Sequence, residues 1–329
     1  MKILICGSQG RIMSAVIPLL LSQGHEVLGV DSGAKWGQTD KPRDYQFVCG
    51  DCSDAALMRP LLKGVDGIIQ AAATLYGVIG FHRRAADILA NDLNLHQTVL
   101  RLSVEAGVER VVYMSSSMVY ERVSSEPYQE DDVETALVPA TDYGLSKLVG
   151  ERLSRAFRGQ YGLQYTIWRP FNVIDPEEEG SDDAGLSHVF ADLIHRIIGK
   201  QENPLTVLGD GNQVRSFLHL REAAEVIAGF SFAPSTCDQI LNIGRDECVS
   251  VRELAEMIWE IALTRGLMSN TAALSFCCTP VPATDVRRRV GSFRKAADLL
   301  GWQSGTSLRE SLTECIERYR ARKGALANS

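Results

Sequence analysis

The sequence predicts an α/β protein built on a doubly wound parallel sheet. Short apolar runs alternate with stretches of helical periodicity, and successive runs lie roughly 20 to 35 residues apart, which is typical of strand–helix–strand units. A Gly-rich turn follows the first run, and an Asp ends the second. Because parallel strands end at a common edge, these residues are expected to gather at one site.

Size, composition and charge set the class of protein. The 329 residues, 45% hydrophobic and 23% charged, are those of a globular protein with a large core. A net charge of -7 argues against nucleic-acid and anionic membrane partners, but it is compatible with a small anion held by local arginines. The chain has no run of about 18 apolar residues and no signal-peptide core after Lys2, so we expect a cytoplasmic protein.

The eight cysteines predict no metal site. Cys49 and Cys52 form a C-x-x-C pair, which could indicate zinc or redox chemistry. No second pair with ligand-like spacing follows, and Cys277 and Cys278 are adjacent. Reduced, structural thiols are therefore the better interpretation.

The first strand leads into a candidate phosphate-binding turn. Lys2–Cys6 is an apolar run that predicts a buried strand, and Gly7 to Gly10 follow it before a helical pattern over Ser14–Ser22. This layout presents helix N-terminal N–H groups to a pyrophosphate. Met13 stands where a third Gly is usual, so we expect altered packing or phosphate approach. An ordinary strand–helix turn is the alternative.

The second strand, Gly24–Asp31, ends in a carboxylate. Asp31 can accept hydrogen bonds from ribose hydroxyls and would repel a 2′-phosphate, which favours NAD over NADP. A strand-terminal Asp in a turn is the alternative interpretation.

Further strands and helices continue the alternation. Small side chains at the end of the fourth strand, Ala71–Ala73, would let a flat cofactor lie close to the backbone. The expected strands are Phe47–Asp51, Val65–Ala73, Arg110–Met114 and Gln239–Ile243, and the expected helices include Ser53–Leu62, Asn91–Ala106 and His188–Ile198.

Tyr143 and Lys147 form a candidate acid–base pair. Four residues apart, they share one face of a helix. An ammonium near a phenol favours the phenolate, so we expect Lys147 to lower the pKa of Tyr143. A hydroxyl from the Ser115–Ser117 run could hold a substrate oxygen beside it. The three groups suit removal of an alcohol proton while a hydride leaves the same carbon.

Together these motifs resemble the NAD-dependent epimerase/dehydratase family of extended short-chain dehydrogenases/reductases, which acts on nucleotide sugars. There is some likeness to GDP-mannose 3,5-epimerases and GDP-fucose synthases. The matching residues keep the family's order over nearly the whole chain: Gly7, Gly10, Asp31, Gly50–Asp54, Ala71–Ala73, Asn94, Ser115–Tyr120, Tyr143, Lys147, Arg169–Val173, Gly209–Arg215, Leu241–Gly244 and Leu300–Trp302.

The resemblance implies a catalytic set and an NAD site. Ser116, Tyr143 and Lys147 would be catalytic, with Tyr143 as the base and Asn94 supporting Lys147 through backbone and water contacts. Cys52 would contact adenine through its main chain, which argues further against a metal. The implied cofactor-binding residues are Gly7, Gln9, Gly10, Arg11, Ile12, Asp31, Asp51, Cys52, Ala71, Ala72, Ala73, Asn94, Tyr143, Lys147, Pro170 and Val173.

The resemblance also implies contacts with a nucleotide-sugar substrate. Arg215 would grip its diphosphate. One of Arg287–Arg289 could reach it too, although a solvated basic turn is equally plausible. His188 would contact substrate rather than act as acid or base, and an exposed surface His is also possible. The implied substrate-binding residues are Tyr76, Ser117, Asn172, His188, Arg215 and Arg287.

Two positions depart from the family. Met118 stands where dehydratases and decarboxylases carry an acid and where fucose synthases and 3,5-epimerases carry a Cys. Since Met has no ionisable proton, those second chemistries cannot run through this position. Glu121 stands where a Gly is usual, which predicts a different turn after Tyr120. The loop Tyr76–Phe81 resembles that of 3,5-epimerases and favours a GDP-linked substrate weakly.

The expected architecture is a Rossmann-type domain with a smaller, mostly helical C-terminal substrate domain. We assign residues 1–173 and about 214–246 to the first, and about 174–213 and 247–329 to the second. The site is expected in the cleft between them. The resemblance also implies a homodimer formed through the helices that hold Asn91–Ala106 and Tyr143–Arg155.

Three hypotheses for function follow. The first is an NAD-dependent nucleotide-sugar epimerase that transiently oxidises C4 of the sugar. The second is a net dehydrogenase or reductase of such a substrate. The third is a non-catalytic NAD(H)-binding protein.

Overall fold

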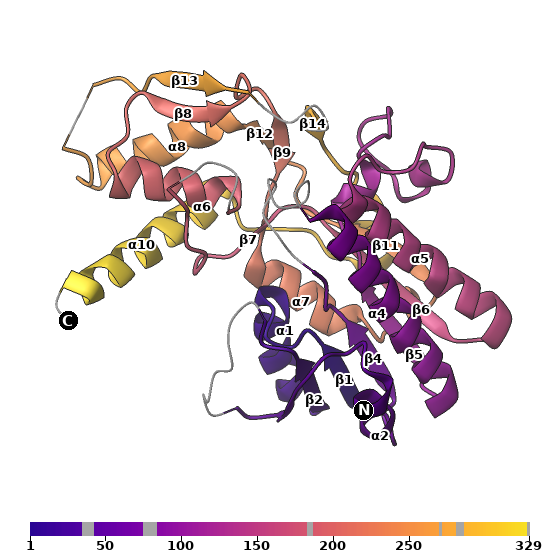
Figure 1. The fold of residues 1–329 in the computed structure, drawn as a ribbon. Coiled ribbons are helices and arrows are strands. Elements are labelled where there is room, and N and C mark those ends of the chain that lie inside the picture. The colour runs from indigo at the N-terminus through magenta and orange to yellow at the C-terminus, as the bar shows by residue number, and fades with distance from the viewer. Residues whose placement is uncertain (35–42, 75–83, 183–186, 270–271, 281–285, 328–329) are drawn as a thin grey trace.

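The centre of the molecule is a seven-stranded parallel sheet with the order β11-β6-β5-β4-β1-β2-β3 (Figure 1). The computed structural model describes residues 1–34, 43–74, 84–182, 187–269, 272–280 and 286–327. The strands of the sheet are β1 (Lys2–Cys6), β2 (Glu26–Asp31), β3 (Gln46–Cys49), β4 (Gly67–Gln70), β5 (Arg110–Met114), β6 (Gln164–Pro170) and β11 (Gln239–Ile243). The chain reverses its direction of travel across the sheet between β1 and β4, which is where such folds bind ligands.

Helices cover both faces of the sheet, and α1 and α7 lie side by side on one of them (Figure 1). There Ile3 and Ile5 of β1 pack with Val16 and Ile227. On the other face, Leu4 and Cys6 belong to a second core with side chains of α2 and α4. The alternation of β1 side chains between two cores explains its unbroken apolar sequence. The helices are α1 (Arg11–Ser22), α2 (Ala55–Leu61), α4 (Ala85–Ala106), α5 (Asp142–Tyr161) and α7 (Leu220–Phe230).

The second part of the molecule is mainly helical. Its helices are α6 (Val189–Ile194), continued by the π-helical turn η3 (His195–Gly199), α8 (Val251–Thr264) and α10 (Leu308–Ala327). Small strand groups accompany them: β8 (Leu205–Leu208) with β13 (Phe276–Thr279), β9 (Val214–Ser216) with β12 (Cys248–Ser250) and β14 (Arg288–Arg289), and β7 (Val173–Ile174) with β10 (Leu218–His219).

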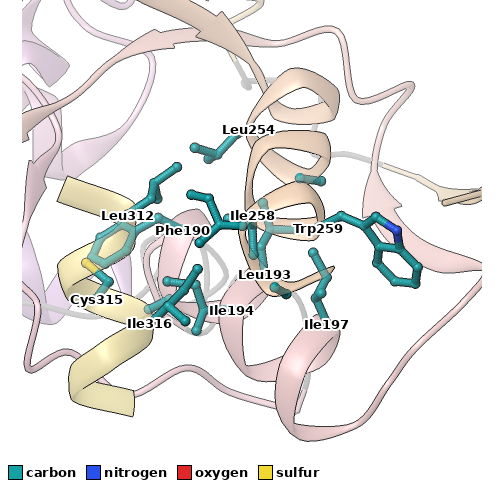
Figure 2. Close-up of a cluster of buried hydrophobic side chains, with 14 of the residues drawn as sticks. Phe190, Leu193, Ile194, Ile197, Leu254, Ile258, Trp259, Leu312, Cys315 and Ile316 are labelled. Carbon is teal, nitrogen blue, oxygen red and sulfur yellow. The ribbon is translucent and has the colours of Figure 1, made fainter. Parts of the chain in front are cut away.

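A separate apolar core holds α6, α8 and α10 together (Figure 2). Phe190 and Ile194 of α6 meet Leu254 and Ile258 of α8, and Ile316 comes from α10. All five side chains are at most 3% exposed. This core is distinct from the two cores of the sheet, so the helical part has a hydrophobic interior of its own.

The predicted fold class is confirmed, with local differences. Helix α4 starts at Ala85, six residues before the expected Asn91, and the helix expected over His188–Ile198 ends as a π-turn. The short helix α9 (Arg294–Leu300) lies against β11, so this part of the C-terminal region returns to the sheet. Within the described residues, no helix combines the length and apolarity needed to cross a bilayer.

Candidate active site

The residues singled out from the sequence gather at one edge of the main sheet. All seven strands are parallel, so their carboxyl ends lie together. The residues at this edge are Gly7 after β1, Asp31 at the end of β2, Ala71–Ala73 after β4, Ser115–Ser117 after β5 and Pro170 at the end of β6.

The turn after β1 needs glycine at Gly7. Its φ of +78° is a left-handed conformation, and a Cβ there would lie 2.7 Å from the Cα of Ala72. The N–H of Gly10 donates to the carbonyl of Gly7 at 3.0 Å, which closes the turn before α1 begins at Arg11. The turn and the Ala71–Ala73 segment therefore touch through their backbones.

The side chain of Met13 is part of the hydrophobic core. Its side chain is 1% exposed and packs with Ile3, Val16 and Ile17. The residue in place of the third glycine therefore points into the layer between α1 and the sheet, and α1 keeps its start directly after Gly10. The altered packing expected from the sequence is accommodated there.

Asp31 is fixed by two backbone donors. Its carboxylate accepts hydrogen bonds from Gln9 N at 3.0 Å and from Gly33 N at 2.9 Å. The acid therefore lies directly beside the Gly-rich turn, where a ribose-binding carboxylate is needed.

The Gly-rich turn has unsatisfied polar groups that fit a dinucleotide. Within the described part of the chain, Gln9 Nε2 and Ser8 Oγ are buried and have no hydrogen-bond partner. Since buried polar atoms are normally paired, a bound phosphate or ribose is a fitting acceptor. Arg11, by contrast, forms an ion pair with Asp175 beyond β7. Ile12 is half-buried against the sheet.

The other predicted cofactor residues line the same edge or its flank. Cys52 is 4% exposed, and its thiol faces Val30 O at 3.8 Å. Asp51 is exposed and accepts from Ser53 N at 2.8 Å. Pro170 and Val173 are half-buried at the ends of β6 and β7.

Ser116 and Tyr143 are brought into hydrogen-bond contact by two different elements. Ser116 precedes the one-turn helix η1 (Ser117–Tyr120) and accepts from Met118 N at 3.2 Å. Tyr143 is the second residue of α5, whose first turn is capped by Thr141. Tyr143 is 8% exposed, and its contact with Ser116 favours the phenolate.

Lys147 lies one turn along α5, at 3% exposure. Its Nζ donates to Met114 O at 2.9 Å and lies 5.7 Å from the centre of the Tyr143 ring. Burial lowers the pKa of Lys147, whereas the carboxylates of Asp92 and Glu151 raise it.

The expected direction of the Tyr143 pKa is wrong for this structure. Burial raises the pKa above its ordinary value, and Asp92 adds to that effect. The hydrogen bond from Ser116 and the positive charge of Arg289 lower it, but they do not outweigh desolvation. The sequence shows that a lysine lies one helical turn from Tyr143, but it does not show how far burial removes the phenol from water.

The buried position beside Lys147 is held by Asp92 rather than by Asn94. The side chain of Asn94 is exposed on α4, and its expected support of Lys147 through backbone and water contacts stays a prediction. Asp92 is fully buried and accepts from Thr74 N at 2.9 Å and from Ser146 Oγ at 3.0 Å. Asp92 shares the buried stripe of α4 with Ile88 and Leu95, a helical spacing that could have identified it.

The predicted substrate residues are distributed unevenly. Ser117 is only 3% exposed within η1, so its side chain is largely withdrawn from solvent. Asn172 adopts a left-handed φ of 33° and donates to Ser216 O at 2.8 Å. His188 begins α6 with its side chain 62% exposed, and its Nδ1 lies 2.8 Å from Glu178. Tyr76 and its loop lie outside the described residues.

Among the three consecutive arginines, Arg289 rather than Arg287 affects the pKa of Tyr143. Arg287 is 73% exposed and pairs with Asp210 at 3.2 Å. Arg289 is half-buried, and its charge lowers the pKa of both Tyr143 and Tyr128. Arg215 is 9% exposed on β9 and donates to Val214 O at 2.8 Å.

The sequence profile of the NAD dependent epimerase/dehydratase family matches residues 3–244. The chain belongs to this family. The stretch includes every strand of the main sheet and the Ser116, Tyr143 and Lys147 side chains, so the family assignment rests on the part of the molecule that builds the site.

Individual relatives span almost the whole chain. GDP-L-fucose synthase 1 of Arabidopsis thaliana is 26% identical over 323 residues, which cover 97% of this chain and 93% of that protein. The crystal structure of UDP-glucose 4-epimerase with UDP-glucose from Thermotoga maritima has a TM-score of 0.83 at 25% identity and covers 98% of this chain and 100% of that one. MoeE5 in complex with UDP-glucose and NAD has a TM-score of 0.79 at 29% identity, with the same coverage.

A buried ion pair supports α5, the helix that carries Tyr143 and Lys147. Arg169 of β6 and Glu151 of α5 are 0% and 2% exposed and pair at 2.6 Å. Glu151 also accepts from Ser115 Oγ, and Arg169 donates to the hydroxyl of Tyr120 at 2.6 Å. The pair therefore joins α5 and β6 to the segment after β5 that carries Ser116.

Proposed function

We propose that the protein is an NAD-dependent nucleotide-sugar epimerase that acts by transient oxidation at C4 of the sugar. The observation that carries the proposal is the hydrogen-bonded pair of Ser116 and Tyr143, with Lys147 one turn away, at the sheet edge that also holds the Gly-rich turn. A base, a hydroxyl that orients the substrate, and a cation are the groups that alcohol oxidation needs.

NAD is the cofactor that the residues fit. Gly7 and Gly10 would admit the pyrophosphate, and the Asp31 carboxylate would hold the ribose hydroxyls. Bound NAD⁺ would accept a hydride from C4 and return it to the opposite face of the sugar. The crystallised relative with NAD and UDP-glucose supports the same cofactor and substrate class.

The side chains of this chain would move the proton. Ser116 would hold the C4 oxygen, and Tyr143 would take the hydroxyl proton as hydride leaves. The ammonium of Lys147 would stabilise the phenolate as it forms. After the keto sugar presents its other face, Tyr143 would return the proton.

Met118 limits the reaction to one carbon. It is half-buried two residues after Ser116, and it has no ionisable proton. Proton exchange at a neighbouring carbon would need a second acid or base at this place. We therefore expect that no hydrogen bound to a carbon of the sugar exchanges with solvent, and that only the C4 hydroxyl proton does.

A net NAD-dependent reductase or dehydrogenase is the second candidate, with a GDP-linked sugar as a possible substrate. The likeness to a GDP-L-fucose synthase favours it. The two candidates differ in whether the cofactor leaves oxidised or reduced after each turnover. A non-catalytic NAD(H)-binding protein is a third hypothesis, and it predicts cofactor binding without turnover.

The first experiment identifies the cofactor. The purified protein is denatured, and released dinucleotide is quantified by chromatography and mass spectrometry. Near-stoichiometric NAD⁺ or NADH supports the epimerase, because the cofactor is then retained through the cycle. Reversible uptake with release of NADH during turnover supports the dehydrogenase. Failure to bind either NAD or NADP would overturn the enzymatic proposal.

The second experiment identifies the reaction. UDP-glucose, UDP-N-acetylglucosamine and GDP-mannose are incubated with the protein in deuterium oxide, and the sugars are analysed by NMR. Inversion at C4 without deuterium on carbon is the expected result, and deuterium at a carbon next to C4 would contradict the role given to Met118. Tyr143→Phe should keep NAD binding and lose at least about 100-fold in kcat.

We also propose that the chain forms a homodimer through α4 and α5. These helices pack side by side and carry the catalytic pair and Asp92. Light scattering of the purified protein tests this, and a monomeric mass at micromolar concentration would contradict it.

A further inference from the structure

The two hydroxyls of the site are held by separate elements whose relative position must be fixed. Ser116 caps η1, and Tyr143 lies in the first turn of α5. Their side chains meet only if η1 stays in place against the N-terminus of α5. The contacts between these two elements therefore determine the geometry of the pair.

Glu121 connects the two elements directly. It is the residue that ends η1, and its carboxylate accepts two hydrogen bonds from Thr141, the residue that caps α5. Thr141 N donates to Oε2 at 2.7 Å, and Thr141 Oγ1 donates to Oε1 at 2.8 Å. Both oxygens of Glu121 are thus used on one residue, two positions before Tyr143.

The contact continues into the first turn of α5. Gly144 N donates to Thr141 Oγ1 at 3.0 Å, so the hydroxyl accepts from the helix and donates to Glu121. Hydrogen bonds in such a chain strengthen one another. Thr141 is 8% exposed, which limits competition from water. This series of hydrogen bonds connects the helix that carries Tyr143 to the segment that carries Ser116.

The backbones of the two elements are also in close contact. A Cβ at Gly144 would lie 2.8 Å from Met118 O and 3.2 Å from Glu121 Oε2. Gly144 therefore allows η1 to approach α5 more closely than another residue would. At such a short separation, small shifts of η1 would change the distance between the two hydroxyls.

We propose that Glu121 is a positioning residue that fixes the distance between the Ser116 and Tyr143 hydroxyls by holding η1 against the cap of α5. The effect of Glu121 on turnover rests on the function proposed above, whereas its effect on the distance between the two hydroxyls does not. Glu121 stands where a glycine is usual in the family. A glycine has no side chain, so it could not form the two hydrogen bonds to Thr141 that connect η1 to α5.

The test uses Glu121→Ala and Glu121→Gln, with Glu134→Ala as a matched control. Glu134 also ties a neighbouring segment to α5, through Arg152 and Arg155, but at the middle of the helix. Gln keeps an acceptor for Thr141 N and should preserve most of the contact. Glu121→Asp replaces Glu121→Ala if the latter does not fold, because it withdraws the carboxylate by one methylene.

The first readout needs no substrate. Protein labelled with ¹³Cζ-tyrosine contains nine labelled rings, and Tyr143→Phe assigns the resonance of Tyr143. We expect Glu121→Ala to shift that resonance and Glu134→Ala to leave it unchanged. An unchanged Tyr143 resonance in Glu121→Ala or Glu121→Asp would overturn the proposal, whatever the enzyme's substrate.

The second readout is turnover on a substrate found for the wild-type protein. Misplacement of the pair should lower kcat by about 10- to 100-fold with KM within about twofold, and Glu121→Gln should recover most of the rate. Equal loss in Glu134→Ala, or full kcat in Glu121→Ala, would contradict the positioning role. Inactivity of the wild-type protein on every sugar would instead count against the proposed function.

Discussion

At the scale of single residues, Asp92 carries the charge with the largest effect on the pKa of both Tyr143 and Lys147. Asp92 is fully buried and accepts a hydrogen bond from Ser146 Oγ. Burial has the larger effect on both groups: Asp92 adds to burial in raising the pKa of Tyr143, and it opposes burial at Lys147, whose pKa burial lowers. The charge of Asp92 therefore favours the charged lysine and the neutral phenol. The charge and the hydrogen bonds of Asp92 can be separated experimentally.

Asp92→Asn should shift the acid limb of the pH profile of kcat to lower pH. Asn can still accept from Thr74 N and can bond Ser146 Oγ, so the geometry is kept while the negative charge is removed. Without that charge, the pKa of Tyr143 falls and its phenolate forms at lower pH. Because burial raises the pKa of Tyr143 above its ordinary value, steady-state rates are measured from pH 7 up to the highest pH at which both proteins stay folded. A limb that stays in place or moves to higher pH would contradict the prediction.

His96 should make the folded protein sensitive to acid. It is 2% exposed, and burial together with the charge of Lys147 lowers its pKa from 6.5 to about 3. In the unfolded chain it binds a proton below pH 6.5, whereas in the folded protein it does not. Stability is therefore lost as pH falls below 6.5, by about 2 kcal/mol at pH 5.

His96→Gln should flatten this pH dependence. Gln cannot be protonated and can still bond the hydroxyl of Tyr113, which lies 3.1 Å from His96 Nε2. The measurement is urea unfolding at pH 7 and pH 5 for both proteins. If the variant loses as much stability between these pH values as the wild type does, the acid sensitivity comes from another group.

The sequence identifies residue types better than it identifies which side chains are buried. Ser116, Tyr143 and Lys147 are found together because their chemistry and spacing are distinctive. Asn94 matches a family motif, whereas Asp92 belongs to no motif, although it shares the buried apolar stripe of α4. Effects of burial on pKa depend on atoms from many segments, which no local pattern contains.

At the scale of secondary-structure elements, a buried ion pair connects α5 to β6. Arg169 and Glu151 are almost completely buried, and Arg169 also donates to Glu130 O at 2.7 Å. Arg169→Met would leave the carboxylate of Glu151 buried without its partner, at an expected cost of about 3–5 kcal/mol in the free energy of unfolding.

A second variant tests the origin of that loss. The double variant Arg169→Met with Glu151→Gln removes the unpaired charge and should recover part of the lost stability. Urea unfolding of the wild type and the three variants gives the coupling energy. A double variant that is less stable than Arg169→Met by the full cost of Glu151→Gln alone would show that the two residues act independently.

The ends of the first two strands are the features of secondary structure that the sequence predicts best. The strand–turn–helix unit at Gly7 and the strand end at Asp31 lie where local signals place them, because both depend on short-range geometry. The turn after Tyr120 is different. Glu121 was expected to alter it, but its bonds to Thr141 join segments 20 residues apart, which only the folded chain shows.

At the scale of the whole molecule, the Gly-rich turn is connected to the helical part. Arg11 at the start of α1 pairs with Asp175 just after β7, and Arg322 of α10 pairs with Glu177 two residues further on. The edge that should bind the dinucleotide is thus tied to the part that should bind the sugar. Ligand binding at this edge is therefore expected to stabilise the protein as a whole.

NAD⁺ should raise the melting temperature more than NADP⁺ at the same concentration. Asp31 is held beside the turn by Gln9 N and Gly33 N, and its carboxylate would repel a 2′-phosphate. A ligand at about 100 times its Kd adds roughly 2.7 kcal/mol to the stability of the folded state, which is a shift of several degrees. Differential scanning calorimetry with each dinucleotide measures the difference.

The source of that preference is tested with two matched variants. Asp31→Asn keeps the shape of the side chain and removes its charge, so the shifts with NAD⁺ and NADP⁺ should become more similar. Asp51 is exposed, and the family resemblance implies that it contacts the adenine rather than the ribose. Asp51→Asn should therefore change both shifts alike. Equal shifts with the two dinucleotides in the wild-type protein would show that Asp31 does not select the cofactor.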